Sequence, residues 1–204
     1  MRIRLQTAIA VLAALFLASC SEQSNKTQAS TNAAADAAGP VTGKTALWEI
    51  YKTARTWAND LAPLSLESKS PPGAKTDNGK AEVWTATFGS LQRKEARSFT
   101  YAVAAHSPDI VKGVSVGHAI PWGGPSRDSL SFDTSDISVD SDVAYATAAK
   151  QASAWISKNS GKQATLALGN ASRFPAPVWY VLWGDKKNGY AVYVNAKTGA
   201  VISK

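Results

Sequence analysis

The chain has 204 residues and a formal net charge of +7, from 22 lysines and arginines against 15 aspartates and glutamates. We expect no nucleic-acid partner, because no cluster of basic residues accompanies a base-reading motif. Cys20 is the one cysteine of the sequence, which excludes an intramolecular disulfide and a thiolate metal cluster.

Residues 1–19 have the pattern of an export signal peptide, since two arginines precede an apolar run that is too short to be trusted as a membrane-spanning helix. The run ends in "LASC", Leu17 to Cys20, which resembles the lipobox of bacterial lipoproteins. The resemblance implies cleavage before Cys20, anchoring in a lipid bilayer through acyl chains on Cys20, and an outer-membrane address because Ser21 follows. An ordinary secretory signal with a leftover thiol is the alternative.

Residues 20–44 are rich in Ser, Thr, Asn, Gln and Ala and have almost no large apolar side chain. Such a segment cannot bury enough surface to offset the entropy of ordering it. We therefore expect the lipidated Cys20 to be followed by a flexible tether with a mean reach of roughly 25–30 Å. The rest of the chain is long enough for one good core or two small ones.

The segment 45–118 is predicted to be a helix followed by antiparallel strands. The helix should span Thr45–Leu61, since apolar residues recur there every three or four positions and Pro63 prevents its continuation. The expected strands are Leu64–Glu67, Glu82–Phe88, Ser98–Ala104 and Val111–His118. Residues 119–139 form the connection to the next unit.

The segment 140–204 repeats this order. Its helix should span Asp142–Asn159, with Asp140 or Ser141 as the N-cap. The expected strands are Ala164–Leu168, Val178–Gly184, Tyr190–Asn195 and Ala200–Ile202. The fold class is therefore α+β, with two units that each pack one helix on an antiparallel sheet of three to four strands. The sequence leaves open whether the two sheets join edge to edge or pack as separate lobes.

The two units also match in sequence. "AEVWTATFGS", Ala81 to Ser90, aligns with "APVWYVLWGD", Ala176 to Asp185, at a constant offset, and a "YAV" follows each copy at Tyr101 and at Tyr190. Matched blocks in the same order predict an internal duplication. Chance similarity of two hairpins is the alternative.

The C-terminal segment "VWYVLWGDKKNGYAVYVNAKTGAVISK" resembles the end of a PepSY domain. The positions that carry the resemblance are Tyr190, Val192, Tyr193, Val194, Asn195, Ala196, Thr198 and Gly199. It covers about Ile137 to Lys204, whereas the first unit matches through the repeat alone. The resemblance implies a non-catalytic inhibitory or chaperone-like module of the cell envelope, whose target is a protein such as a peptidase. The tandem arrangement also resembles secreted β-lactamase inhibitor proteins in shape.

The sequence offers little catalytic or metal-binding chemistry. His106 and His118 have no neighbouring ligand at metal-site spacing, and no nucleophile elbow or phosphate-binding loop is present. The acidic segment from Asp133 to Asp142 lacks the glycine and glutamate of a calcium loop, so we interpret it as turns and helix caps, with weak binding of a hard cation as the alternative. We expect a non-enzymatic protein without cofactor or metal.

Aromatic and basic residues are the remaining signal. Seven tryptophans are many for this length, and both faces of the strand around Trp179 are apolar. One face should meet the helix, and the other is either covered by the partner unit or exposed for binding. The candidate binding surface comprises Trp84, Trp179, Trp183, Arg93, Lys94 and Arg97. Binding of a glycan or an anionic envelope polymer, or a purely structural spacer role, are the alternatives to a protein target.

Overall fold

The computed structural model describes residues 39–106 and 108–202. The predicted signal peptide, Cys20 and most of the predicted tether lie outside these residues, and their roles stay predictions. No helix in the described part of the chain is long and apolar enough to cross a membrane.

The first half begins with helix α2, Gly43–Ala54, which Thr42 caps at its N-terminus. Ala46, Leu47, Ile50 and Ala54 form its buried stripe. The helix ends at Ala54 and not at the predicted Leu61, because a turn follows that places the Trp57 ring 6.0 Å from the ring of Phe99. Tertiary packing of Trp57 thus replaces the last turns of the predicted helix.

The strands of the first half form a meander after α2. Between the first and the second long strand, the chain makes a small hairpin with positive φ at Asn78 and Gly79. The strands are β1 (Ala62–Lys69), β2 (Thr76–Asp77), β3 (Lys80–Ala81), β4 (Val83–Ser90), β5 (Glu95–Ala102) and β6 (Gly113–Pro121).

The second half follows a connection that contains the short helix η1, Thr134–Asp136. Asp140, one of the two predicted N-cap residues, caps α3. The predicted single helix is divided at Ala152, after which the Trp155 ring packs 6.3 Å from Tyr190. The elements are α3 (Ser141–Gln151), α4 (Ser153–Lys158), β7 (Ala164–Gly169), β8 (Val178–Trp183), β9 (Tyr190–Asn195) and β10 (Val201–Ile202).

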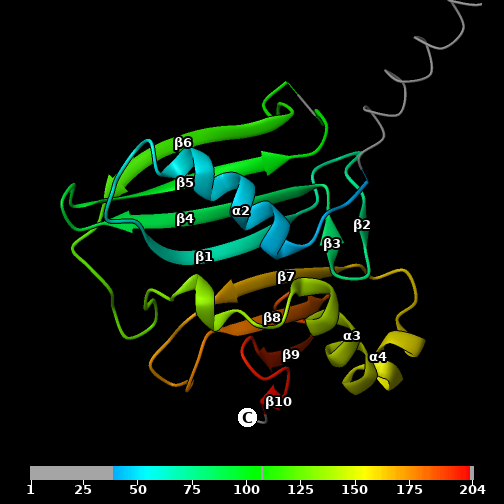
Figure 1. Ribbon diagram of the computed structural model, residues 1–204. Coiled ribbons are helices and arrows are strands. Elements are labelled where there is room, and N and C mark those ends of the chain that lie inside the picture. The colour runs from blue at the N-terminus through cyan, green and yellow to red at the C-terminus, as the bar shows by residue number, and fades with distance from the viewer. Residues whose placement is uncertain (1–38, 107, 203–204) are drawn as a thin grey trace, which may run out of the picture. The chain divides into compact units, whose positions relative to one another are not determined.

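The seven long strands and the short β10 form one antiparallel sheet of eight strands, in the order β10-β9-β8-β7-β1-β4-β5-β6 (Figure 1). The first strand of each half lies at the centre, and β1 pairs with β7 at Ser65↔Gly169, Leu66↔Leu168 and Glu67↔Ala167. The two halves therefore join edge to edge, which answers the question that the sequence left open. The α+β class with a large antiparallel sheet is confirmed.

Helices α2 and α3 pack on the same face of this sheet. The backbone N–H groups of Gly43 and Lys44 at the start of α2 donate to Ser141 Oγ (2.8 Å) and Asp140 Oδ1 (2.9 Å) at the start of α3. Below this contact, Trp84 and Trp179 meet edge to face, with ring centroids 6.4 Å apart. The core is thus continuous across both halves.

The two tryptophans occupy equivalent positions. Trp84 Nε1 donates to the carbonyl of Val41 (3.1 Å), and Trp179 Nε1 donates to the carbonyl of Val139 (2.9 Å). Each valine stands one residue before the N-cap of its helix. A duplicated unit would give this correspondence, although the duplication itself stays a prediction.

Candidate functional site

The three tryptophans of the predicted binding surface are buried. Trp84 and Trp179 are 0% exposed and Trp183 is 1% exposed, all within the core under the helices. The prediction that they form an exposed surface is therefore wrong. Strand alternation puts Trp179 and Trp183 on one face, but the helices cover that face, and the large apolar indole rings are buried in the core.

The basic residues of the predicted surface lie elsewhere. Arg93 and Lys94 are exposed in the β4–β5 turn, and Arg97 is half-buried on β5. The guanidinium carbons of Arg93 and Arg97 lie 5.7 and 5.3 Å from the ring centroid of Trp57. The structure therefore places these cations beside Trp57, near the end of β4, whereas Trp84 lies at the start of β4. They do not lie at the Trp84–Trp179 pair.

The opposite face of the sheet carries none of the helices in the described residues. The strand registers align Tyr193, Tyr180, Ala167, Glu67, Thr85 and Thr100 in one row from β9 to β5. Every member of this row is half-buried. We call this helix-free side the open face; its centre has small or polar side chains, and its β8–β9 end has tyrosines.

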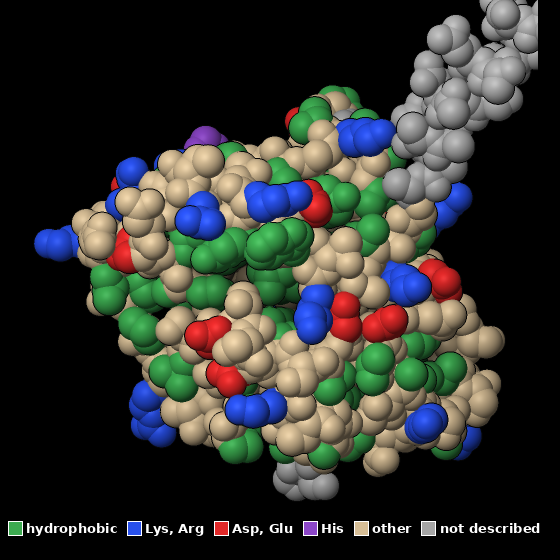
Figure 2. All heavy atoms as spheres, in the orientation of Figure 1, with side chains coloured by type: hydrophobic (Ala, Val, Ile, Leu, Met, Phe, Trp, Pro, Cys, Tyr) green, Lys and Arg blue, Asp and Glu red, His purple; other side chains and the backbone are tan. Residues whose placement is uncertain are grey.

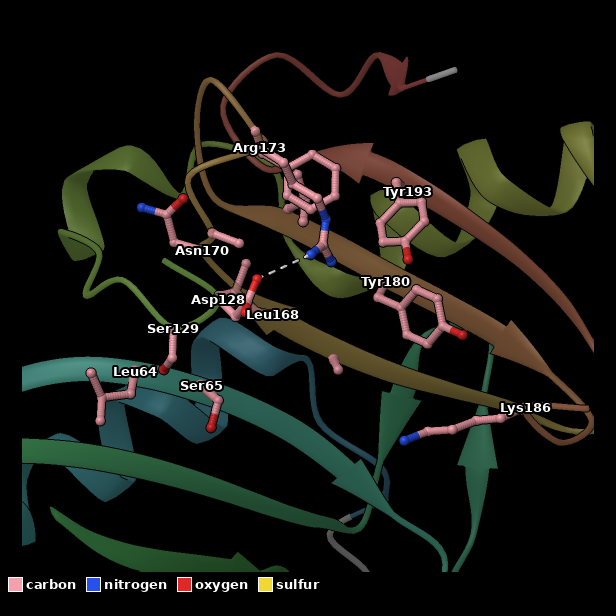
Figure 3. Close-up of a pocket in the computed structure, with 15 residues that line it drawn as sticks. Leu64, Ser65, Asp128, Ser129, Leu168, Asn170, Arg173, Tyr180, Lys186 and Tyr193 are labelled. Carbon is pink, nitrogen blue, oxygen red and sulfur yellow. Dashed lines mark ion pairs between the residues drawn. The ribbon is translucent and has the colours of Figure 1, made fainter. Parts of the chain in front are cut away.

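A trough on the open face lies beside the two tyrosines (Figure 3), with a cavity volume of about 410 Å³. Ala167 and Gly169 of β7 line it with minimal side-chain volume. Because these two residues are small, the sheet is hollowed between Tyr180 on one side and the connection residues Asp128 and Ser129 on the other. We call this hollow the tyrosine trough.

Aromatic rings form a continuous series along the trough. The Tyr180 and Tyr193 centroids are 5.1 Å apart, and Phe174 lies 5.2 Å from Tyr193. The Arg173 guanidinium lies 4.8 Å from the Phe174 centroid and 3.8 Å from Asp128. Figure 3 shows Arg173 and Asp128 on one side of the tyrosine pair and Lys186 on the other.

Burial in the trough wall, together with the neighbouring Tyr193 phenol, raises the pKa of Tyr180. The Tyr180 phenol is thus neutral at physiological pH, and a phenol hydroxyl can donate and accept hydrogen bonds. The site has apolar rings, hydroxyl groups and cationic rims, a composition that suits binding of a partner through stacking and hydrogen bonds.

A second hollow of about 410 Å³ lies on the open face of the first half. Thr85, Thr100 and Ser115 line it, and the Thr85 and Thr100 hydroxyls hydrogen-bond at 2.9 Å. The open face therefore has an aromatic end in the second half and a hydroxyl-rich end in the first.

The helix-bearing face, shown in Figure 2, has an apolar groove between α2 and the connection. Leu47, Tyr51 and Ile137 line it, with a cavity volume of about 240 Å³. Trp48 lies at this groove with 62% of its surface exposed and stacks on Tyr51. Trp48 is thus an exposed aromatic side chain on the side opposite to the tyrosine trough.

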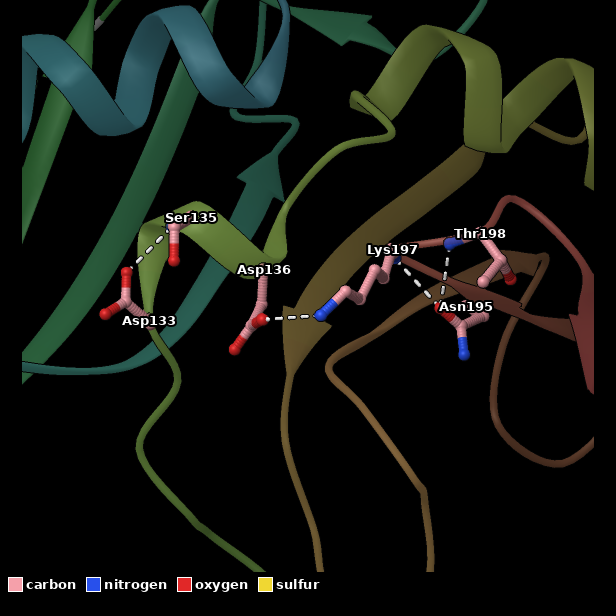
Figure 4. A network of polar contacts seen from close by, with 6 residues as sticks. All are labelled: Asp133, Ser135, Asp136, Asn195, Lys197 and Thr198. Carbon is pink, nitrogen blue, oxygen red and sulfur yellow. Dashed lines mark hydrogen bonds and ion pairs between the residues drawn. The ribbon is translucent and has the colours of Figure 1, made fainter.

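The acidic segment has structural roles (Figure 4). Asp133 accepts from the backbone N–H of Ser135 (2.8 Å), which lowers the pKa of Asp133, and Asp140 caps α3. Asp136 pairs with Lys197 at 3.3 Å and so ties the connection to the terminal turn. The predicted turn and capping roles are confirmed at Asp133 and Asp140, and no group of three potential metal ligands occurs among the described residues.

The two histidines lie apart. His118 is exposed on β6, whereas the side chain of His106 is buried 3.5 Å from the carboxylate of Glu82. Glu82 also accepts from the backbone N–H of Lys75 at 2.9 Å. Neither histidine lines the tyrosine trough.

No family model matches the chain, and no curated protein matches it. Among solved structures, a protein from Clostridium difficile 630 described as a lipoprotein has 15% sequence identity and a TM-score of 0.47, covering 78% of this chain and 90% of its own. A likeness at this level carries no argument about function. The PepSY resemblance rests on the sequence motifs between Ile137 and Lys204 alone.

Sequence reasoning missed Tyr180 and Tyr193 as site residues. Strand alternation placed Tyr180 on the face opposite Trp179, so a signal was present. The small residues at Ala167 and Gly169 were a second signal, since a strand without bulk on one face leaves a hollow beside larger neighbours. The loop residues Arg173 and Asp128 gave no signal, because only the fold brings their loops together.

Proposed function

We propose that the chain is a non-catalytic, envelope-anchored module that binds a protein through the tyrosine trough. The observation that carries the proposal is the series of rings Phe174, Tyr193 and Tyr180 along a hollow on the open face, which carries no helix of the described residues. The lipobox-like "LASC" supports the anchoring through Cys20 and the outer-membrane address.

The composition of the trough favours a protein target. Tyr and Arg are enriched among the residues that dominate protein–protein binding energy. Tyr180 lies on β8 and Tyr193 lies on β9. Each of these strands pairs with a neighbouring strand on both sides, so hydrogen bonds fix the backbone at both tyrosines. Rings held this way lose little conformational entropy on binding.

The PepSY resemblance adds the class of target. It implies an inhibitory or chaperone-like module, and a peptidase of the cell envelope is the target that follows from it. In this proposal, the terminal hairpin from Tyr190 to Ile202 builds one wall of the trough and supplies Tyr193.

The test uses immobilised residues 39–204, which keep Val41 and therefore its hydrogen bonds to Ala81 and Trp84. Envelope proteins that bind are compared between the wild type and Tyr180→Ala and Tyr193→Ala variants. Each substitution should weaken binding of the target by about 2 kcal/mol or more, roughly 30-fold, as expected for hot-spot aromatics.

Trp48→Ala is the matched control, since Trp48 is an exposed aromatic on the other side of the sheet. It should leave binding of the target unchanged. Equal binding by the two tyrosine variants and the wild type, with their fold intact by circular dichroism, would refute the proposal.

Glycan binding is the second candidate. The version based on Trp84 and Trp179 fails because both rings are buried. The half-buried rings of Tyr180 and Tyr193 on the open face give a sugar a surface for stacking. Titration with envelope polysaccharide distinguishes a glycan target from a protein target. Saturable binding of the polysaccharide that Tyr193→Ala abolishes would favour a glycan.

A further inference from the structure

Two cationic side chains converge on one buried indole after α2. Trp57 is 8% exposed and packs on Phe99 of the core. Arg97 and Arg93 place their guanidinium carbons 5.3 and 5.7 Å from its ring centroid. We call Trp57, Arg93 and Arg97 the Trp57 cluster; it lies on the helix-bearing side of the sheet, opposite to the tyrosine trough.

The charges of this cluster are not neutralised within the described residues. No carboxylate there lies within ion-pair distance of Arg93 or Arg97. Asp60 is nearby, but its oxygens accept from Ser90 Oγ (2.5 Å) and the backbone N–H of Gln92 (2.9 Å). Two guanidinium groups beside one ring thus repel each other without a counter-charge.

Two hydrogen-bond donors of the cluster lack acceptors. Trp57 Nε1 and Arg97 Nε are buried and have no partner in the described residues. Buried donors are almost always satisfied in native proteins, by protein groups, ordered water or a bound ion. An indole N–H and a guanidinium N–H can only donate, so the missing group must be an acceptor.

A polar hollow of about 200 Å³ adjoins the cluster. Trp57, Arg93, Gln92 and Asp60 line it, whereas Arg97 does not line it and joins the cluster through its contact with the Trp57 ring. One water molecule occupies about 30 Å³ of liquid volume, so the hollow has room for a small polyatomic group. Asp60 keeps its negative charge in the hollow because the Gln92 and Ser90 hydrogen bonds lower its pKa, and a bound anion must therefore lie toward the arginines.

We propose that the Trp57 cluster binds a phosphate group. Donors from three side chains suit an anion with at least three acceptor oxygens, and the planar fork of arginine matches phosphate bidentately. Arg93 and Arg97 neutralise the charge of the phosphate, and Trp57 Nε1 donates to one of its oxygens. Arg93 is exposed and its guanidinium carbon lies 5.7 Å from the Trp57 ring centroid, so solvent has access to this side of the site.

The test titrates the full chain in detergent with inorganic phosphate and follows the indole N–H signals by NMR at constant ionic strength. The signal that is missing in Trp57→Phe identifies Trp57. We expect a saturable shift of this signal in the wild type. Arg93→Gln and Arg97→Gln should each lower the affinity for phosphate by at least about 10-fold. Arg97→Lys should lower it less, because lysine keeps the positive charge but lacks the planar guanidinium group.

Arg127→Gln is the control, since Arg127 is an exposed arginine of the connection outside the cluster. It should bind phosphate like the wild type. A parallel titration with glycerophosphoglycerol, a phospholipid headgroup without acyl chains, separates the sources: saturation by the diester identifies a headgroup-type phosphate, and saturation by inorganic phosphate alone identifies a free anion.

Absence of saturable binding of either compound would overturn the proposal. So would equal affinity of the wild type and Arg93→Gln, which is decisive because Arg93 is exposed and its substitution leaves the core intact. Loss of the tyrosine trough in a Tyr193→Ala variant should leave phosphate binding unchanged, so this site and the proposed protein-binding site can fail independently.

Discussion

Single residues fix the close contacts between the two halves. Gly43, the first residue of α2, lies so near to Trp179 that an added Cβ would be 2.6 Å from the ring. Its backbone N–H also donates to Ser141 at the start of α3. The absence of a side chain at Gly43 is therefore what allows the helix to lie on the buried indole.

Gly43→Ala should destabilise the protein by about 1–3 kcal/mol, since Trp179 is buried and the core must shift to admit a methyl group. Urea unfolding followed by fluorescence measures the change in the free energy of unfolding. Gly123→Ala is the control, because nothing lies within 4 Å of a Cβ at Gly123. Equal stability of the two variants would contradict the assigned contact.

The turns and strands show how much a local pattern can predict. Tyr190–Asn195 is a strand at the predicted bounds, because period-two alternation is clear there. In the turn before it, Asn-Gly at 188–189 is a dipeptide that favours positive φ, but the positive φ is at Gly184. Asp185 organises this turn by accepting from the backbone N–H groups of Lys187 (2.8 Å) and Asn188 (2.9 Å).

These hydrogen bonds, with Asn188 the larger cause, lower the pKa of Asp185 in the folded state. The ionised carboxylate therefore stabilises the folded state at pH values above the unfolded pKa of about 3.9. This stabilisation is lost as the pH falls through the lower pKa of the folded state. Asp185→Asn should therefore be less stable than the wild type at pH 7 and equally stable below pH ~2. Thermal unfolding between these pH values measures the difference. A pH-independent difference would show that charge is not the cause.

Helix ends and the open face were harder to predict from the sequence. The apolar stripe of α2 continues through Ala58, but the chain turns earlier because Trp57 packs on Phe99 and Asp60 binds Ser90. For the site, alternation shows which side chains share a face of a strand and not which face the helices cover. Alternation puts Tyr180 on the face opposite to Trp179, whereas its exposure depends on the whole sheet.

At the scale of the molecule, the seam between β1 and β7 makes two meanders into one sheet. No local pattern predicts this pairing, because the two strands are far apart in sequence. The paired register ends at Glu67↔Ala167, and the hydroxyl of Ser68 continues the bonding by accepting from the backbone N–H of Leu166 at 2.9 Å. Ser68 is 2% exposed, so no water replaces it.

Ser68→Ala should leave the N–H of Leu166 without an acceptor at the seam and lower the free energy of unfolding by about 1–3 kcal/mol. Because both halves share one core, the unfolding should remain a single transition. Ser157→Ala, an exposed serine of α4, should change the stability little. Two separate transitions in the wild type would contradict a shared core.

The central claim is that the open face meets a protein partner at the tyrosine trough. The most direct measurement places a photoreactive amino acid at Tyr193 of the full chain in the native envelope, with Trp48 as the paired position on the opposite side. We predict, after illumination, one discrete crosslinked protein from position 193 that position 48 does not give. The same crosslinks from both positions, or crosslinks from position 48 alone, would contradict the claim.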